Sequence, residues 1–172
     1  MKFISILAVA ASALAFSSGV KAAAVSDAQI AAIVVAANQV DIDAGKYAAE
    51  KTANPAVKEF AEKMVNDHTS VNKSAVDLVT KLHVTPEEND TSRALKAGGE
   101  KNLENLGTLT GAALDKAYVD HEVAYHEQVI DAIDKVLIPN AENAELKALL
   151  VSVRPAFLEH LKHAKHLQSQ LK

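Results

Sequence analysis

Apolar residues recur at alternating steps of three and four along most of the chain, and no stretch follows the two-residue alternation of a strand. This spacing is typical of amphipathic helices, whose apolar stripe faces a core. We therefore expect an all-α domain with four long helices, each carrying one such stripe. The helices are predicted at residues 27–53, 55–82, 110–137 and 144–170.

Signals that begin and end helices support these boundaries. Ser26 and Gln29 have the spacing of a capping box, and Asn54 followed by Pro55 is typical of one helix ending and the next beginning. Pro155 falls inside the last predicted helix. Because the apolar pattern continues across it, we expect one kinked helix there rather than two separate helices.

The segment between the second and third long helices is less regular. Gly98, Gly99 and Gly107 interrupt residues 89–111, so we expect a long crossover connection that contains one short helix. Two tight helical hairpins joined by one long crossover form the arrangement of ferritin-like proteins. The predicted fold is therefore a ferritin-like antiparallel four-helix bundle with the crossover between its second and third helices.

The N-terminal segment, residues 1–23, has the pattern of a secretory signal peptide. Lys2 gives it a basic start, an apolar run follows, and small residues precede the predicted cleavage point. The alternative, a permanent membrane anchor, needs about 20 apolar residues, which is longer than this run. We expect residues 24–172 to form one exported domain, periplasmic or secreted, with no transmembrane segment.

Composition narrows the possible functions. The chain has 172 residues, 49% of them hydrophobic, and a formal net charge of -4. These values suit one globular domain and lack the basic excess of a nucleic-acid-binding protein. The chain has no cysteine, which excludes disulfides, thiolate nucleophiles, iron–sulfur clusters and cysteine-ligated zinc. No particular protein partner is indicated.

One strongly polar residue interrupts the apolar stripe of each predicted helix: Asp41, His68, His126 and His160. Asp41 and His68 lie equally far from the first interhelical turn, so they should share one level of the bundle. His126 and His160 match in the same way if the second turn centres on Asn143. The four side chains are therefore expected to meet inside the bundle.

Such a group has two interpretations, and the sequence leaves both open. Three imidazoles and a carboxylate are a common ligand set for divalent zinc, copper, nickel or iron, which favours a protein for metal buffering or an envelope stress response. Alternatively, the group is a metal-free polar layer in which Asp41 holds a protonated histidine. That layer would set helix register in a protein that binds an envelope partner.

Three neighbouring residues are auxiliary candidates. Asp67 adjoins His68 and could support it or add a ligand, although a solvated position is the simpler expectation. Glu122 lies one turn before His126; it could face the same site or equally lie at the rim of the site. Met64 lies one turn before His68; it could offer a soft ligand, but it is equally typical core filler.

Missing motifs argue against several reactions. The di-iron enzymes of the ferritin-like fold use two Glu-x-x-His motifs, and no histidine in this chain has an acidic residue three positions before it. No phosphate-binding loop or His-Glu-x-x-His zinc motif is present. We therefore assign no catalytic residue and favour a binding role, with a metal-dependent hydrolase or oxidase as the less favoured alternative.

Several short runs carry a family resemblance: Asp41–Lys46, Val57–Ala61, Met64–His68, Ala117–Val119, His126–Glu127 and Leu158–Leu161. Together they resemble the exported family called domain of unknown function 4142, over nearly the whole chain after residue 23. The resemblance implies a ferritin-like fold and an exported location, and no established activity. Its site positions would be Asp41, Asp67, His68, His126 and His160. Family members usually have glutamate where Asp41 stands, so the shorter side chain implies a water-bridged contact.

Overall fold

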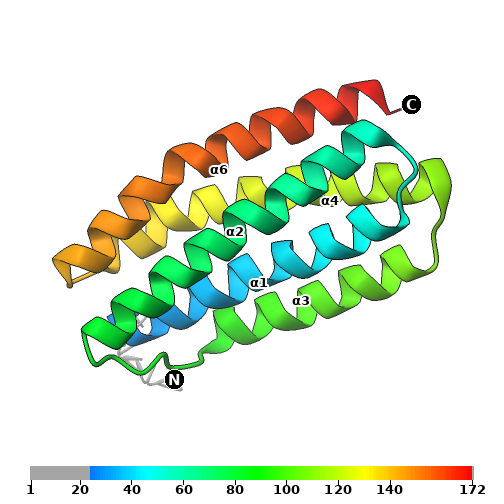
Figure 1. Ribbon diagram of the computed structural model, residues 1–172. Coiled ribbons are helices and arrows are strands. Elements are labelled where there is room, and N and C mark those ends of the chain that lie inside the picture. Colours follow the sequence, from blue (N-terminus) through cyan, green and yellow to red (C-terminus); the bar gives the residue numbers. More distant parts are fainter. Residues whose placement is uncertain (1–23, 172) are drawn as a thin grey trace, which may run out of the picture.

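The computed structural model describes residues 24–171, and all regular structure in that range is helical (Figure 1). The predicted signal peptide, residues 1–23, lies outside the described residues. None of the described helices is long and apolar enough to cross a membrane. The helices are α1 (Asp27–Lys51), α2 (Pro55–Lys81), α3 (Asp90–Gly107), α4 (Gly111–Ala132), the π-helical turn η1 (Ile133–Leu137), the single turn α5 (Ile138–Asn140) and α6 (Ala144–Gln170).

The helix ends form where the capping signals predict them. The Ser26 hydroxyl accepts a hydrogen bond from the Gln29 backbone N–H at 3.2 Å, and the Gln29 side chain accepts one from the Ser26 N–H at 3.3 Å. Asn54 and Asn143 cap α2 and α6 in the same manner through their side-chain oxygens. As expected, α6 runs through Pro155 as one helix.

The crossover segment differs from its prediction. We expected one short helix, but α3 has 18 residues and lies along α1. Gly99 explains the difference, because a Cβ atom there would lie 2.7 Å from Cγ2 of Val40 on α1. The glycine therefore permits close helix packing, whereas the sequence pattern treated it as a helix breaker. A Cβ at Gly98 would meet no described atom within 4 Å.

The end of the third long helix also differs from its prediction at residue 137. The helical path continues through η1 and α5 to Asn140. In the wider turn of η1, the N–H of Ile138 donates to the carbonyl of Ile133, five residues back. Pro139 follows directly and has no N–H that would need a partner, so the chain keeps helical geometry for one more turn.

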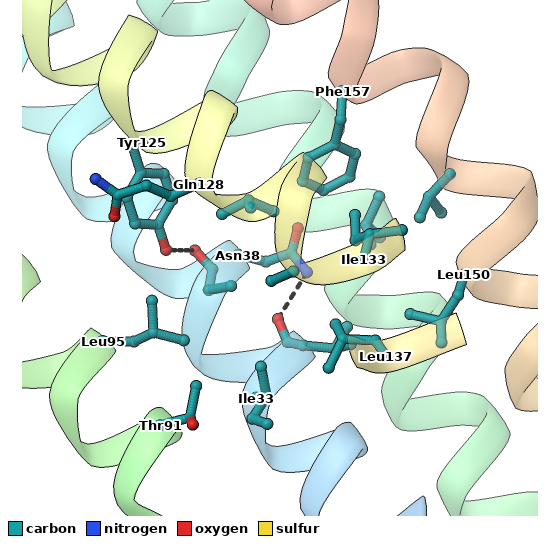
Figure 2. A pocket seen from close by; sticks show the side chains of 16 residues that line it. Ile33, Asn38, Thr91, Leu95, Tyr125, Gln128, Ile133, Leu137, Leu150 and Phe157 are labelled. Atoms are coloured by element: carbon teal, nitrogen blue, oxygen red, sulfur yellow. Dashed lines mark hydrogen bonds between the residues drawn. The ribbon is translucent and has the colours of Figure 1, made fainter. Parts of the chain in front are cut away.

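The long helices enclose one core. α1 packs against α2, α3 and α4, while α6 packs against α2 and α4; α3 lies on the outer side of α1, away from α6 (Figure 1). Two apolar clusters fill this core, and we name each after a phenylalanine. The Phe60 cluster includes Ala44, Met64 and Tyr118, and the Phe157 cluster includes Ile30, Ile133 and Leu150 and borders a cavity (Figure 2).

Candidate metal centre

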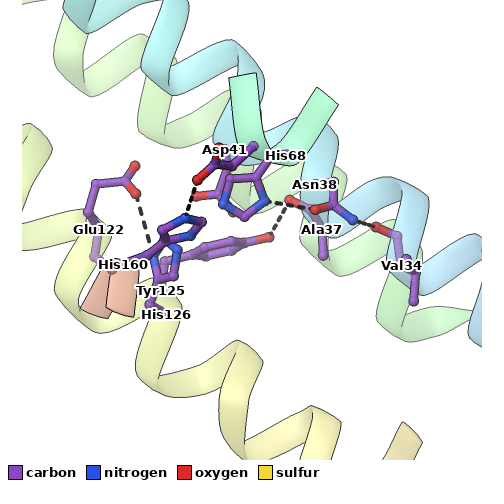
Figure 3. A network of polar contacts seen from close by, with 10 residues as sticks. Val34, Ala37, Asn38, Asp41, His68, Glu122, Tyr125, His126 and His160 are labelled. Carbon is purple, nitrogen blue, oxygen red and sulfur yellow. Dashed lines mark hydrogen bonds and ion pairs between the residues drawn. The ribbon is translucent and has the colours of Figure 1, made fainter. Parts of the chain in front are cut away.

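Each of the four core helices contributes a buried polar residue at the level between the Phe60 cluster and the Phe157 cluster. Asp41 comes from α1, His68 from α2, His126 from α4 and His160 from α6, and at most 2% of each residue is exposed. Their side chains gather at a common point (Figure 3). The structure thus brings together the four residues that the sequence nominated, and their role as metal ligands stays a prediction.

The three imidazole rings contact one another. The ring centroid of His68 lies 5.6 Å from that of His126 and 5.2 Å from that of His160, and the latter two are 5.5 Å apart. One nitrogen from each ring lies within 4.8 Å of the corresponding nitrogens of the other two. Three nitrogen atoms from three helices are therefore close enough to face one shared cation.

A side-chain amide orients the His68 ring. Nδ1 of His68 lies 2.7 Å from Oδ1 of Asn38, and Nδ2 of Asn38 donates to the carbonyl of Val34 at 2.8 Å (Figure 3). Because the Asn38 nitrogen is the donor in that second bond, its oxygen must accept from His68. Nδ1 of His68 therefore carries the ring proton, and Nε2 keeps its lone pair.

Different acceptors orient the other two rings. Nδ1 of His126 donates to the backbone carbonyl of Glu122 at 3.0 Å, and Nε2 of His160 donates to Oδ2 of Asp67 at 2.8 Å. The remaining ring nitrogens, Nε2 of His68, Nε2 of His126 and Nδ1 of His160, are buried and have no hydrogen-bond partner among the described residues. Metal-binding histidines typically show this pattern, with one nitrogen held by an outer acceptor and the other free.

Two buried carboxyl groups lie beside the imidazoles, in a second group of possible ligands that shares only His126 with the first. Oxygens of Asp41 and Glu122 and one nitrogen of His126 all lie within 4.8 Å of one another. Oδ2 of Asp41 is 3.5 Å from Nε2 of His68, and Oε2 of Glu122 is 3.5 Å from Nδ1 of His126. All four carboxyl oxygens are buried without a hydrogen-bond partner in the described part of the chain.

Burial disfavours every charged form in this cluster. It raises the pKa of Asp41 well above its ordinary value, and contact with Glu122 offsets part of that shift. It also raises the pKa of Glu122, and the negative charge of Asp41 raises it further. Without a bound cation, the two carboxyls therefore resist ionising together.

Burial shifts the pKa values of the three imidazoles in the opposite direction, downward. Burial lowers the pKa of His68 well below its ordinary value, and positive charge on the neighbouring histidines would lower it further. Burial lowers the pKa of His126 to about 4. Burial also lowers the pKa of His160, although Asp67 opposes the shift. All three rings are consequently neutral at pH 7, which is the form that ligates a metal.

The auxiliary candidates have separate places. Asp67 is partly exposed, bonds His160 and pairs with Lys63 at 2.7 Å, so it orients a ring from the surface. Glu122 is fully buried, and its carboxyl lies beside Asp41 and His126 rather than at the rim of the site. Met64 packs in the Phe60 cluster with apolar neighbours.

Sequence reasoning missed Asn38, which is 2% exposed and holds His68. A signal was available, because Asn38 lies one turn before Asp41 on the same face of α1. It also missed Phe157 as part of the site. The Phe157 ring meets the His68 ring edge-on, with centroids 5.1 Å apart, and so closes the cluster on the side of the cavity.

Comparison with known proteins gives a family and no function. The family model described as Domain of unknown function (DUF4142) matches residues 11–167. No curated protein and no solved structure matches the chain. The chemistry of the cluster must therefore carry any assignment.

Proposed function

Because the chain belongs to the DUF4142 family, whose description names no activity, we propose from the site alone that it binds a divalent transition metal through His68, His126 and His160. Asp41 or Glu122 would supply a carboxylate oxygen to the same ion. The role would be metal buffering or delivery rather than catalysis. The N-terminal pattern supports action outside the cytoplasm, and the helix order supports a ferritin-like bundle for the fold.

One observation carries the proposal: the atoms that face the inside of the cluster are acceptors. Each imidazole directs its only N–H outward, to Asn38, to a backbone carbonyl or to Asp67. Three nitrogen lone pairs and two carboxyl groups then remain inside without a donor in the described chain. Leaving a buried polar group unpaired costs about 1–3 kcal/mol.

A metal-free polar layer satisfies this cluster less well. Protonating both Asp41 and Glu122 supplies two donors for three nitrogen lone pairs, and the lowered pKa values of the imidazoles disfavour further protons. The buried Tyr118 hydroxyl is one more donor without a partner among the described residues, but its pKa responds to burial and to the two carboxyls rather than to the imidazoles. A divalent cation accepts all three lone pairs at once and compensates an ionised carboxyl. The donor set, three imidazoles with carboxylate, fits zinc, copper, nickel or iron better than calcium or magnesium, which prefer oxygen ligands.

The test compares metal content between matched variants. The protein is purified without an affinity tag of histidines, titrated separately with zinc, copper, nickel and iron, and analysed for bound metal. The His68→Ala/His160→Ala double variant removes two imidazoles of the cluster. The His83→Ala/His166→Ala double variant removes two exposed imidazoles and serves as the control.

We expect about one equivalent of metal in the wild type and in the control, and none in the cluster variant. Metal retained by the cluster variant would contradict the site. A wild-type protein that binds none of the four ions would favour the metal-free polar layer. Export is tested separately, by sequencing the N-terminus of the protein isolated from its host, which should begin near residue 24.

A further inference from the structure

A cavity of about 220 Å³ lies beside the histidine cluster and is not explained by metal binding. It is bordered by α1, α2, α3, α6 and the segment from α4 through η1 (Figure 2). Three residues border both features. Asn38 holds His68, the Phe157 ring packs against His68, and the Tyr125 ring lies edge-on to His126. Phe157 therefore separates the cavity from the imidazoles.

The inner part of the cavity is apolar, and the polar side-chain atoms that border it already have partners within the protein. Ile33, Leu137 and Leu150 form aliphatic walls. Both polar atoms of the Asn38 amide already have partners, one at Val34 and one at His68. The hydroxyl of Tyr125 donates to the carbonyl of Ala37 at 3.1 Å. A polar group placed at this depth would lose its hydration and find little in return.

The outer part of the cavity is polar but uncharged. Thr91 on α3 and Gln128 on α4 line it, and both residues are exposed, so they form its mouth (Figure 2). No charged side chain of the described residues lines the cavity. The cavity therefore has a polar entrance, formed by hydroxyl and amide groups, and an apolar interior.

We propose that this cavity binds a small neutral amphiphile, with its hydrocarbon part toward Phe157 and a hydroxyl or carbonyl head at Thr91 and Gln128. A cavity of about 150 Å³ in another protein holds benzene, so 220 Å³ corresponds to a body of about nine non-hydrogen atoms. The π-helical turn at Ile133–Leu137 forms part of the wall, and such turns are frequent at functional sites. This proposal is independent of the metal.

The experiment uses 1-octanol as the probe and 1,8-octanediol as its matched partner. Both have the same hydrocarbon length, but the diol must place its second hydroxyl against the apolar inner wall. Binding is followed by NMR titration of the metal-free protein. Nuclear Overhauser contacts from the octanol methyl group to the methyl groups of Ile33 and Leu150 locate the bound molecule.

Two variants test the location in a second way. Ala132→Phe places a ring at a residue that lines the cavity, whereas Ala124→Phe places the same ring at an exposed position on the same helix. Circular dichroism checks that both variants fold. If Ala132→Phe does not fold, the contacts to Ile33 and Leu150 in the wild type decide the matter alone.

We expect saturable octanol binding to the wild type and to Ala124→Phe, with the contacts named above, and at least tenfold weaker binding of the diol. Binding should be lost in Ala132→Phe. Absence of saturable binding, equal binding of the two probes, or contacts elsewhere would overturn the proposal. Self-association of the chain that octanol reverses would also overturn it, because the cavity would then be an interface between copies.

Discussion

Nδ1 of His68 lies 2.7 Å from Oδ1 of Asn38, and this one contact determines which nitrogen of the ring can face the cluster. The Asn38 oxygen accepts the ring proton, while the Asn38 nitrogen is held by the carbonyl of Val34. The amide cannot turn over without losing both bonds. Asn38 is therefore a positioning residue for the proposed metal centre.

Replacing Asn38 should weaken metal binding without abolishing it. In Asn38→Leu the N–H of His68 loses its acceptor, and the ring is free to rotate or to change tautomer. We expect affinity to fall about 10–100-fold, measured by competition with a chelator. Asn38→Asp keeps an acceptor for the ring N–H but places a second oxygen against the Val34 carbonyl, so its affinity should fall between those of wild type and Asn38→Leu. Gln39→Ala, one exposed position away, should have no effect. Equal affinity of Asn38→Leu and Gln39→Ala would refute the positioning role.

Replacing Asp67 should have a smaller effect than replacing Asn38. Asp67 also receives a ring N–H, from His160, but it is partly exposed, so water can take its place in Asp67→Ala. We expect a loss of about tenfold or less on the same chelator assay. Asp77→Ala is a matched control, because Asp77 pairs with Lys73 across one turn of α2 just as Asp67 pairs with Lys63.

Glu122→Gln should stabilise the metal-free protein at high pH. The pKa of Glu122 is raised in the folded state, so above its ordinary value of 4.5 the unfolded chain ionises more readily and folding is disfavoured. This penalty is largest at pH 8 and disappears as the pH falls toward 4.5. We expect the melting temperature at pH 8 to rise by about 2–4 °C, equivalent to about 1 kcal/mol.

The pH series separates this carboxyl effect from that of the imidazoles. Their lowered pKa values destabilise the fold as the pH falls below 6.5, in wild type and variant alike, so only the difference between the two proteins reports Glu122. Glu159→Gln changes an exposed carboxyl and should leave the melting temperature unchanged at every pH. A gain from Glu122→Gln that grows on acidification would contradict the assigned pKa direction.

The two adjacent glycines of α3 should respond oppositely to alanine. Gly98→Ala meets no described atom and removes the flexibility of a helical glycine, so we expect about 0.5–1 kcal/mol of added stability. In Gly99→Ala the new Cβ would lie 2.7 Å from Cγ2 of Val40, so either the Val40 side chain or α3 must shift, at about 1–3 kcal/mol. Urea unfolding of both variants gives the comparison; equal effects would mean that α3 does not pack closely on α1.

The sequence predicts those parts of the site that depend on a pattern within one helix, and it misses those that depend on contacts between helices. Asp41, His68, His126 and His160 each interrupt a regular apolar stripe, and a stripe can be read along one helix. Asn38 was missed although it lies one turn before Asp41, because its role depends on a hydrogen bond with His68, which is 30 residues away on another helix. Glu122 was placed only as auxiliary, since its full burial depends on how α4 is rotated against its neighbours.

The fold likewise has features that local sequence predicts and features that depend on contacts between helices. The boundaries of α1, α2 and α6 depend on caps within a few residues of the helix end, and these agree with the prediction to within two residues. The extent of α3 could not be predicted in this way. Its glycines reduce helix propensity locally, and packing against α1, including the approach of Gly99 to Val40, compensates that loss.

The outer position of α3 has a consequence for how the molecule opens. Only Ser92, Gly99 and Leu106 are buried in this helix, which packs mainly on α1, whereas the imidazoles come from α2, α4 and α6. Few buried contacts make a local unfolding unit of low free energy. Backbone amides of α3 should therefore exchange with deuterated water sooner than those around His68 or His126. Fluctuations of that one helix would admit solvent and small molecules past Thr91 while the histidine layer stays intact.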